Sequence, residues 1–119
     1  MAIAMEKLTE MLYFQPVNPH QYWHKQVIAE DEGVSRYFPG VLRLAYYYID
    51  YQDNLSVLVV FRREGEYHAD RVLAYQAVIG PAARQGDPKE VVPSLAAAAE
   101  SCEDYWKGSL AGVFGEKQP

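Results

Sequence analysis

The sequence predicts an α+β domain in which a three-stranded antiparallel meander packs against two N-terminal helices and one long C-terminal helix. The central region, residues 41–79, is rich in β-branched and aromatic residues and is interrupted by turn signals. Apolar residues at helical spacing occur before and after this region. The chain has 119 residues, half of them hydrophobic, and shows no repeat or linker, so we expect a single domain over 1–119.

Two helices are expected ahead of the sheet. Residues 3–13 carry apolar side chains at the spacing of a short amphipathic helix. After a proline-containing connection, Asn18 is a candidate N-cap, Pro19 suits the first helical position and Gln21 the third. In this capping-box pattern, side chains satisfy the free backbone donors of a first turn. A second helix is therefore predicted over 19–31.

The predicted meander consists of strands over 41–51, 55–62 and 67–79. The stretch 52–54 can adopt the left-handed conformations of a hairpin turn, and Gly65 supplies a second turn. The middle strand is apolar on both faces, which predicts helices on one face and another covering, such as a second subunit, on the other. The stretch 67–79 also fits one face of a helix, so both alternatives stay open there.

The last predicted element is a helix over 93–107. Its apolar stripe includes Cys102, beside acidic residues that would raise the pKa of the thiol. Gly108 is a candidate C-cap, and residues 112–119 are expected to form a frayed tail.

The net charge and the number of cysteines limit the classes of function that the sequence allows. A formal net charge of −5 and a pI near 5.1 argue against nucleic-acid binding, which requires clustered Lys and Arg. They favour a basic partner, with the alternative that a net charge of this size serves only solubility. A single cysteine, no apolar run long enough for a bilayer and no signal-peptide core predict a cytoplasmic protein without a membrane partner.

The three histidines suggest one chemical hypothesis. His20 and His24 are spaced to share one face of a helix, and His68 or a carboxylate could complete a metal site. A metalloprotease helix would carry Glu directly after its first histidine, where this chain has Gln21. A metal-dependent or small-molecule-binding enzyme that uses these histidines is therefore an alternative function.

No other motif predicts catalysis. His68 and Asp70 are two residues apart but lack a nucleophile, and Ser109 follows neither the spacing nor the strand of a nucleophile elbow. No glycine-rich loop resembles a phosphate-binding motif, so we expect no nucleotide or other cofactor. These observations lean against an enzyme and yield no catalytic residue.

Aromatic content gives the leading hypothesis. The chain has ten tyrosines and two tryptophans, and tyrosine is enriched where proteins meet partners. We therefore expect a small acidic, non-enzymatic protein-binding module, such as an inhibitor, immunity-type factor, adaptor or chaperone-like protein. Its partner would be another protein, with homodimerisation as one way of covering the apolar face, and a structural subunit of a larger assembly is a further alternative. The expected contact residues lie on one sheet face and at its end: Tyr46, Tyr48, Tyr75, Asp50 and Asp53.

Overall fold

The computed structural model describes residues 12–19, 26–88 and 94–115. Its strands and its long helix are β1 (Gln15–Val17), β2 (Gln26–Val34), β3 (Val41–Ile49), β4 (Asn54–Arg63), β5 (Leu73–Pro81) and α3 (Leu95–Phe114). Two short 3-10 turns, η2 (Ala69–Arg71) and η3 (Ala82–Arg84), flank β5.

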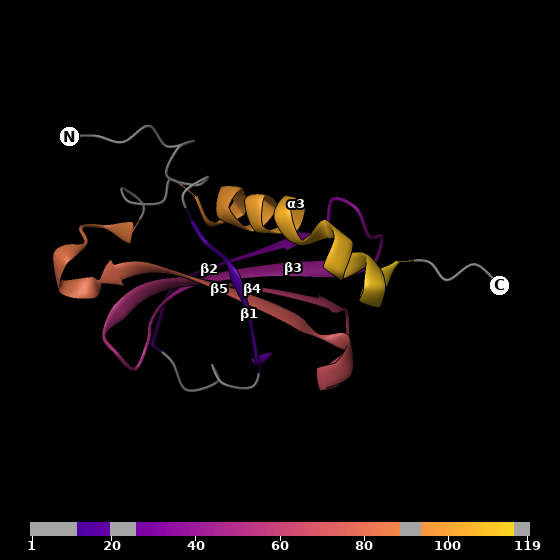
Figure 1. Ribbon diagram of the computed structural model, residues 1–119, viewed down its shortest axis with the longest axis horizontal. Helices are drawn as coiled ribbons and strands as arrows, with labels where there is room; N and C mark the ends of the chain where they lie inside the picture. Colours follow the sequence, from indigo (N-terminus) through magenta and orange to yellow (C-terminus); the bar gives the residue numbers. More distant parts are fainter. Residues whose placement is uncertain (1–11, 20–25, 89–93, 116–119) are drawn as a thin grey trace.

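The strands form one antiparallel five-stranded sheet in the order β1-β5-β4-β3-β2. The helix α3 lies across one face of this sheet (Figure 1). Strands β1 and β2 are consecutive in the chain but occupy opposite edges. The sheet therefore has a face covered by α3, here called the helix face, and an opposite face that no helix of the described residues covers, here called the open face.

Alternating side chains of the central strands build the core on the helix face. On β4, Leu55, Val57, Val59 and Phe61 point toward α3 and are at most 2% exposed. Apolar side chains on both faces and β-branched residues favour a central strand, because such residues pack well on a pleated, doubly covered surface. The prediction that this stretch forms a middle strand is confirmed, because β4 pairs with β3 on one side and with β5 on the other.

The helix α3 begins after Ser94, whose hydroxyl accepts a hydrogen bond from the Ala97 backbone N–H at 2.9 Å. It continues through Gly108, which the sequence suggested as its C-cap, and ends at Phe114. The guanidinium of Arg63 donates to the Phe114 carbonyl oxygen at 3.2 Å. A cation at this end of a helix stabilises it, because the last carbonyls carry partial negative charge.

The predicted fold class is wrong in its sheet and in its N-terminal part. Residues 26–31, expected to end a helix, belong to β2, and residues 15–17, expected to be a connection, form β1. The capping-box pattern is a local signal, whereas β2 pairs along its length with β3, and such tertiary pairing overrides helix propensity. The first predicted helix lies mostly in 1–11, outside the described residues, and described Leu12 and Tyr13 belong to no helix.

The third predicted strand exists but starts later than expected. Residues 69–71 form η2, whose first turn is capped by the His68 side chain, and β5 begins at Leu73. Pairing with β4 on one side and β1 on the other decides the alternative between strand and helix in favour of a strand.

Candidate functional site

A cluster of buried polar groups lies between α3 and the sheet. Glu103 is fully buried and accepts hydrogen bonds from the Ser35 hydroxyl, the Arg36 backbone N–H at 3.0 Å and the Arg43 guanidinium at 3.2 Å. The side chain of Arg43 lies beside Gly33, where an added Cβ would stand 3.4 Å from its Nη2 atom. These groups satisfy one another, so the cluster joins α3 to β3 and to the loop after β2.

The same cluster bears on the reactivity of Cys102. The thiol is fully buried, and burial raises its pKa, with a further rise from the neighbouring Glu103 carboxylate. A nucleophilic cysteine needs the opposite shift, because the thiolate is the reactive form. Cys102 therefore acts as a small apolar core residue, and the expected upward shift of its pKa is confirmed.

The open face is defined by the register of the strands. Its rows run across the sheet from Glu30 through Tyr46 and Leu58 to Gln76, and from Glu32 through Leu44 and Val60 to Ala74. Two further rows flank these. One runs from Val27 through Tyr48 and Ser56 to Val78, and the other from Val34 through Leu42 to Arg62.

The centre of the open face is buried. Tyr48, Leu58 and Ala74 are at most 6% exposed and form a small second cluster, against which Tyr46 and Val60 pack. Exposure increases from this centre toward β2. There Glu30 and Glu32 are exposed, and Val34 is 68% exposed.

The region between this centre and β2, here called the acidic corner, comprises Glu30, Glu32, Val34, Leu42, Leu44 and Tyr46. Each β2 residue of the acidic corner faces an apolar or aromatic residue of β3 in the register. Burial raises the pKa of Tyr46, and the Glu30 carboxylate raises it further, while Arg62 opposes the rise. The phenol of Tyr46 thus lies in the field of the carboxylate beside it. The corner combines half-buried apolar surface with negative charge.

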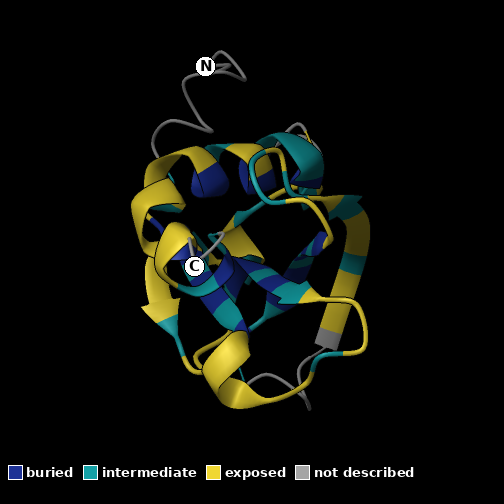
Figure 2. Cartoon of the chain, turned by 90° about the vertical axis from the view of Figure 1, so that its right-hand side faces the viewer, coloured by how far each residue is buried: buried dark blue, intermediate teal, exposed yellow. Residues whose placement is uncertain are grey.

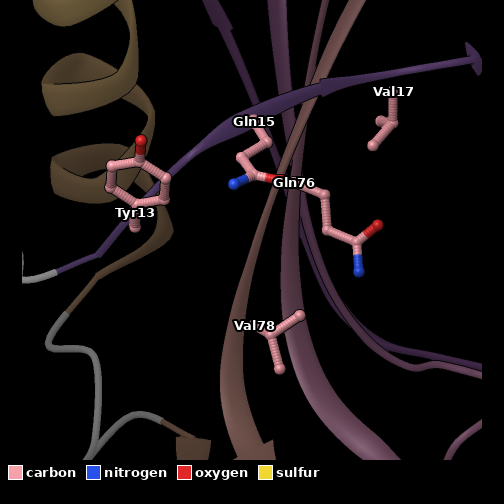
Figure 3. Close-up of a pocket in the computed structure, with 5 residues that line it drawn as sticks. All are labelled: Tyr13, Gln15, Val17, Gln76 and Val78. Atoms are coloured by element: carbon pink, nitrogen blue, oxygen red, sulfur yellow. The ribbon is translucent and has the colours of Figure 1, made fainter.

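A hollow of about 350 Å³ lies at the other end of the open face, next to β1 (Figure 3). Its described lining residues are Tyr13, Gln15, Val17, Gln76 and Val78. Two amides and two valines among them supply hydrogen-bonding groups and apolar contact. Within the described part of the lining, the phenol of Tyr13 is the one group with acid–base or nucleophilic chemistry.

The structure separates the predicted tyrosines. Tyr46 and Tyr48 share the open face, but Tyr48 is only 1% exposed, so Tyr46 is the ring of this pair that a partner could reach. Tyr75 lies on the helix face, where its ring stacks on Trp106 with centroids 5.0 Å apart. Burial raises the pKa of Tyr75 to about 12.

Asp50 and Asp53 lie in the turn between β3 and β4. The Asp50 carboxylate accepts hydrogen bonds from the backbone N–H groups of Gln52 and Asn54 at 2.8 and 2.9 Å, and from the Ser56 hydroxyl at 3.4 Å. Asp53 has a φ of 60°, the left-handed conformation that such a turn requires. These contacts give Asp50 a role in shaping the hairpin, at the end of the open face remote from η2.

The predicted histidine site is described in part. His20 and His24 lie outside the described residues. His68 is exposed, and its Nδ1 atom accepts a hydrogen bond from the Asp70 backbone N–H at 3.3 Å. Among residues 12–19, 26–88 and 94–115, no group of three His, Cys, Asp or Glu residues is placed to hold a metal ion.

The position of Glu30 and Glu32 on an edge strand was not predicted from the sequence, because the helix expected over 19–31 included Glu30 and ended just before Glu32. The available signal was Val27 and Ile28 directly ahead of them, because two adjacent β-branched residues favour a strand. Sequence reasoning also missed Arg43, a charged residue at an inward position of an otherwise apolar alternation.

In the part of the chain that the structure describes, no helix combines the length and the apolar character needed to cross a bilayer. Comparison of the chain with protein-family models, with curated proteins and with solved structures finds no match.

Proposed function

We propose that this protein is a non-enzymatic binding module that holds a basic partner protein on the acidic corner of its open face. The observation that carries the proposal is the exposed pair Glu30 and Glu32 beside the half-buried apolar surface of Leu44 and Tyr46. Protein interfaces usually combine an apolar core with a polar rim.

The proposal narrows the expected contact surface. Tyr46 remains a contact residue, whereas Tyr48 and Tyr75 support the sheet from buried positions. Asp50 and Asp53 lie at the end of the same face and contribute negative potential there, while the Asp50 carboxylate also shapes the turn. Carboxylates on one face raise the association rate of a basic protein by electrostatic steering.

Affinity capture from the native host, followed by mass spectrometry, tests the proposal. The decisive variant is Glu30→Lys with Glu32→Lys, and the matched control is Glu64→Lys with Asp70→Lys, because both pairs are exposed and change the net charge equally. We expect a basic protein to be retained by the wild type and the control, and to bind the corner variant at least tenfold more weakly. Equal retention, or equal loss, on the two variants would contradict a contact at the corner.

The contribution of the tyrosine is tested with Tyr46→Ser, with Tyr105→Ser as its control. Tyr105 is 71% exposed on α3, in the layer on the other side of the sheet. We expect Tyr46→Ser to weaken the captured complex about tenfold and Tyr105→Ser to leave it unchanged, since buried aromatic rings are frequent hot spots of interfaces. Circular dichroism of each variant verifies that it is folded.

A further inference from the structure

The two edges of the sheet are protected differently. Strand β1 has three residues, and Pro16 at its centre has no backbone N–H to offer to another strand. Strand β2 has nine residues, without proline or lysine. Within the described ranges it pairs with β3 alone, so its outer side presents a row of backbone donors and acceptors.

The side chains of β2 are also largely exposed to solvent. Val27, Ile28 and Val34 are each at least 50% exposed, and Glu30, Asp31 and Glu32 are exposed between them. Figure 2 shows this strand largely in yellow at the right of the view. A long exposed edge strand with apolar side chains at both ends is a template for strand addition.

The negative charge of β2 determines which kind of strand can pair with its outer edge. In an antiparallel pair of two copies with full overlap, Glu30 of one copy would face Glu30 of the other, with Glu32 on the diagonal. Like charges directly opposite each other destabilise a strand pair. The acidic centre thus disfavours self-association and favours a segment with basic residues.

The spacing of β2 defines the pattern of that segment. Glu30, Glu32 and Val34 follow one another at every second position and therefore point to the same face. A complementary strand has basic residues at two alternate positions and an apolar residue at the next alternate position.

We propose that β2 is a docking strand, to which an extended basic segment of the partner protein adds as a sixth strand of the sheet. This inference depends on the proposed function and specifies how the partner is held: backbone hydrogen bonds fix its register, and the carboxylates of Glu30 and Glu32 select lysine or arginine. The bulge between Val27 and Ala29 marks one end of the regular pairing surface.

Backbone-modified peptides test this docking mode on the full chain. The parent probe is a capped heptapeptide, Val-Thr-Lys-Thr-Lys-Thr-Val, and two analogues carry N-methyl groups on its second, fourth and sixth residues or on its third and fifth residues. Alternate residues of a strand direct their N–H groups to opposite sides, so only one analogue loses the donors that face β2.

We expect the parent peptide to bind and to slow hydrogen exchange of β2 amides. One N-methylated analogue should bind within about threefold of the parent, and the other at least tenfold more weakly. Replacing both lysines with glutamate, or using the Glu30→Lys, Glu32→Lys protein, should abolish binding. The Glu64→Lys, Asp70→Lys protein should bind the parent peptide as the wild type does.

The inference is overturned if the two analogues behave alike, whether both bind or both fail, since a contact by charge alone does not distinguish the two sides of a strand. It is also overturned if the parent peptide does not bind. Either result leaves the proposed function to its own test, because capture of a host protein that depends on Glu30 and Glu32 would still indicate a contact at the acidic corner.

Discussion

The two faces of the sheet are built from the same strands but differ in how far their side chains are buried. On the helix face, Val59 and its neighbours are completely enclosed, and even the charged Glu103 has its partners inside the fold. On the open face, enclosure is limited to a small central cluster, and the acidic corner remains accessible. Adjacent residues of one strand can thus differ completely in their exposure to solvent, because alternate side chains point to opposite faces.

The largest expected effect comes from the buried carboxylate of the helix face. Glu103→Leu removes the buried partner of the Arg43 guanidinium and leaves it only the exposed Glu100 carboxylate, and breaking a buried ion pair destabilises a protein by about 3–5 kcal/mol. Glu100→Gln, at the exposed carboxylate 3.7 Å from Arg43, should cost under about 1 kcal/mol. Urea unfolding measures both, and a similar small cost for both variants would show that the cluster does not anchor α3.

A second large effect is expected at alkaline pH. Burial raises the pKa of Tyr47 and of Tyr75 to about 12, while the unfolded phenols ionise near 10. Their stabilisation is complete below pH 10 and is lost as the pH rises from about 10 to 12, because the unfolded chain releases these protons first. The free energy of unfolding should therefore fall over this range, and Tyr47→Phe should reduce the slope.

The control for the alkaline experiment is Val59→Ala, which removes apolar atoms from the same helix-face core but no phenol. This change should lower the free energy of unfolding and leave its slope against pH as in the wild type. A free energy of unfolding that is constant from pH 10 to 12 would contradict the enclosure of the helix-face phenols.

Two adjacent valines of β4 allow the packing of the two faces to be compared at one position of the sheet. Val59→Ala removes side-chain carbons from a fully enclosed site and should cost about 2 kcal/mol. Val60→Ala, on the half-exposed open face, should cost about half as much. Thermal and urea unfolding measure the difference, and equal costs would mean that the open face is as tightly packed as the helix face.

The smallest effect is expected at the exposed end of the open face. Val34→Thr keeps the β-branched shape at a position that is 68% exposed, so the free energy of unfolding should change by less than about 0.5 kcal/mol. The same variant should bind the parent heptapeptide about threefold more weakly, because Val34 points to the same face of β2 as Glu30 and Glu32. A large loss of stability would instead assign Val34 to the fold.

The elements that could be predicted are those whose sequence pattern lies within the element itself. The start of β3 at Val41 and nearly all of β4 follow from alternation and turn residues, and the stripe of α3 follows from helical spacing. Strand β2 could not be predicted in this way, since its acidic centre is stable as a strand only through pairing with β3. A capping pattern just before it gave a competing local signal.

The candidate site was predicted less well, for a different physical reason. Alternation places Tyr46 and Tyr48 on one face of their own strand, but it does not determine the phase of the next strands. Register with β4 places Tyr75 opposite Val59, on the helix face. Exposure is likewise a tertiary property, so no sequence pattern distinguished the enclosed Tyr48 from the accessible Tyr46.

The position of β1 has a consequence for the order of folding. Gln15 pairs with Gln76, so the first described strand finds its neighbour only after most of the chain has been synthesised. Hairpins between β3, β4 and β5 close short loops, whereas docking of β1 closes a long one, and long closures are slow. We therefore expect β3, β4 and β5 to pair first during synthesis of the chain. Strand β1 should add to the edge of this sheet in a later folding step.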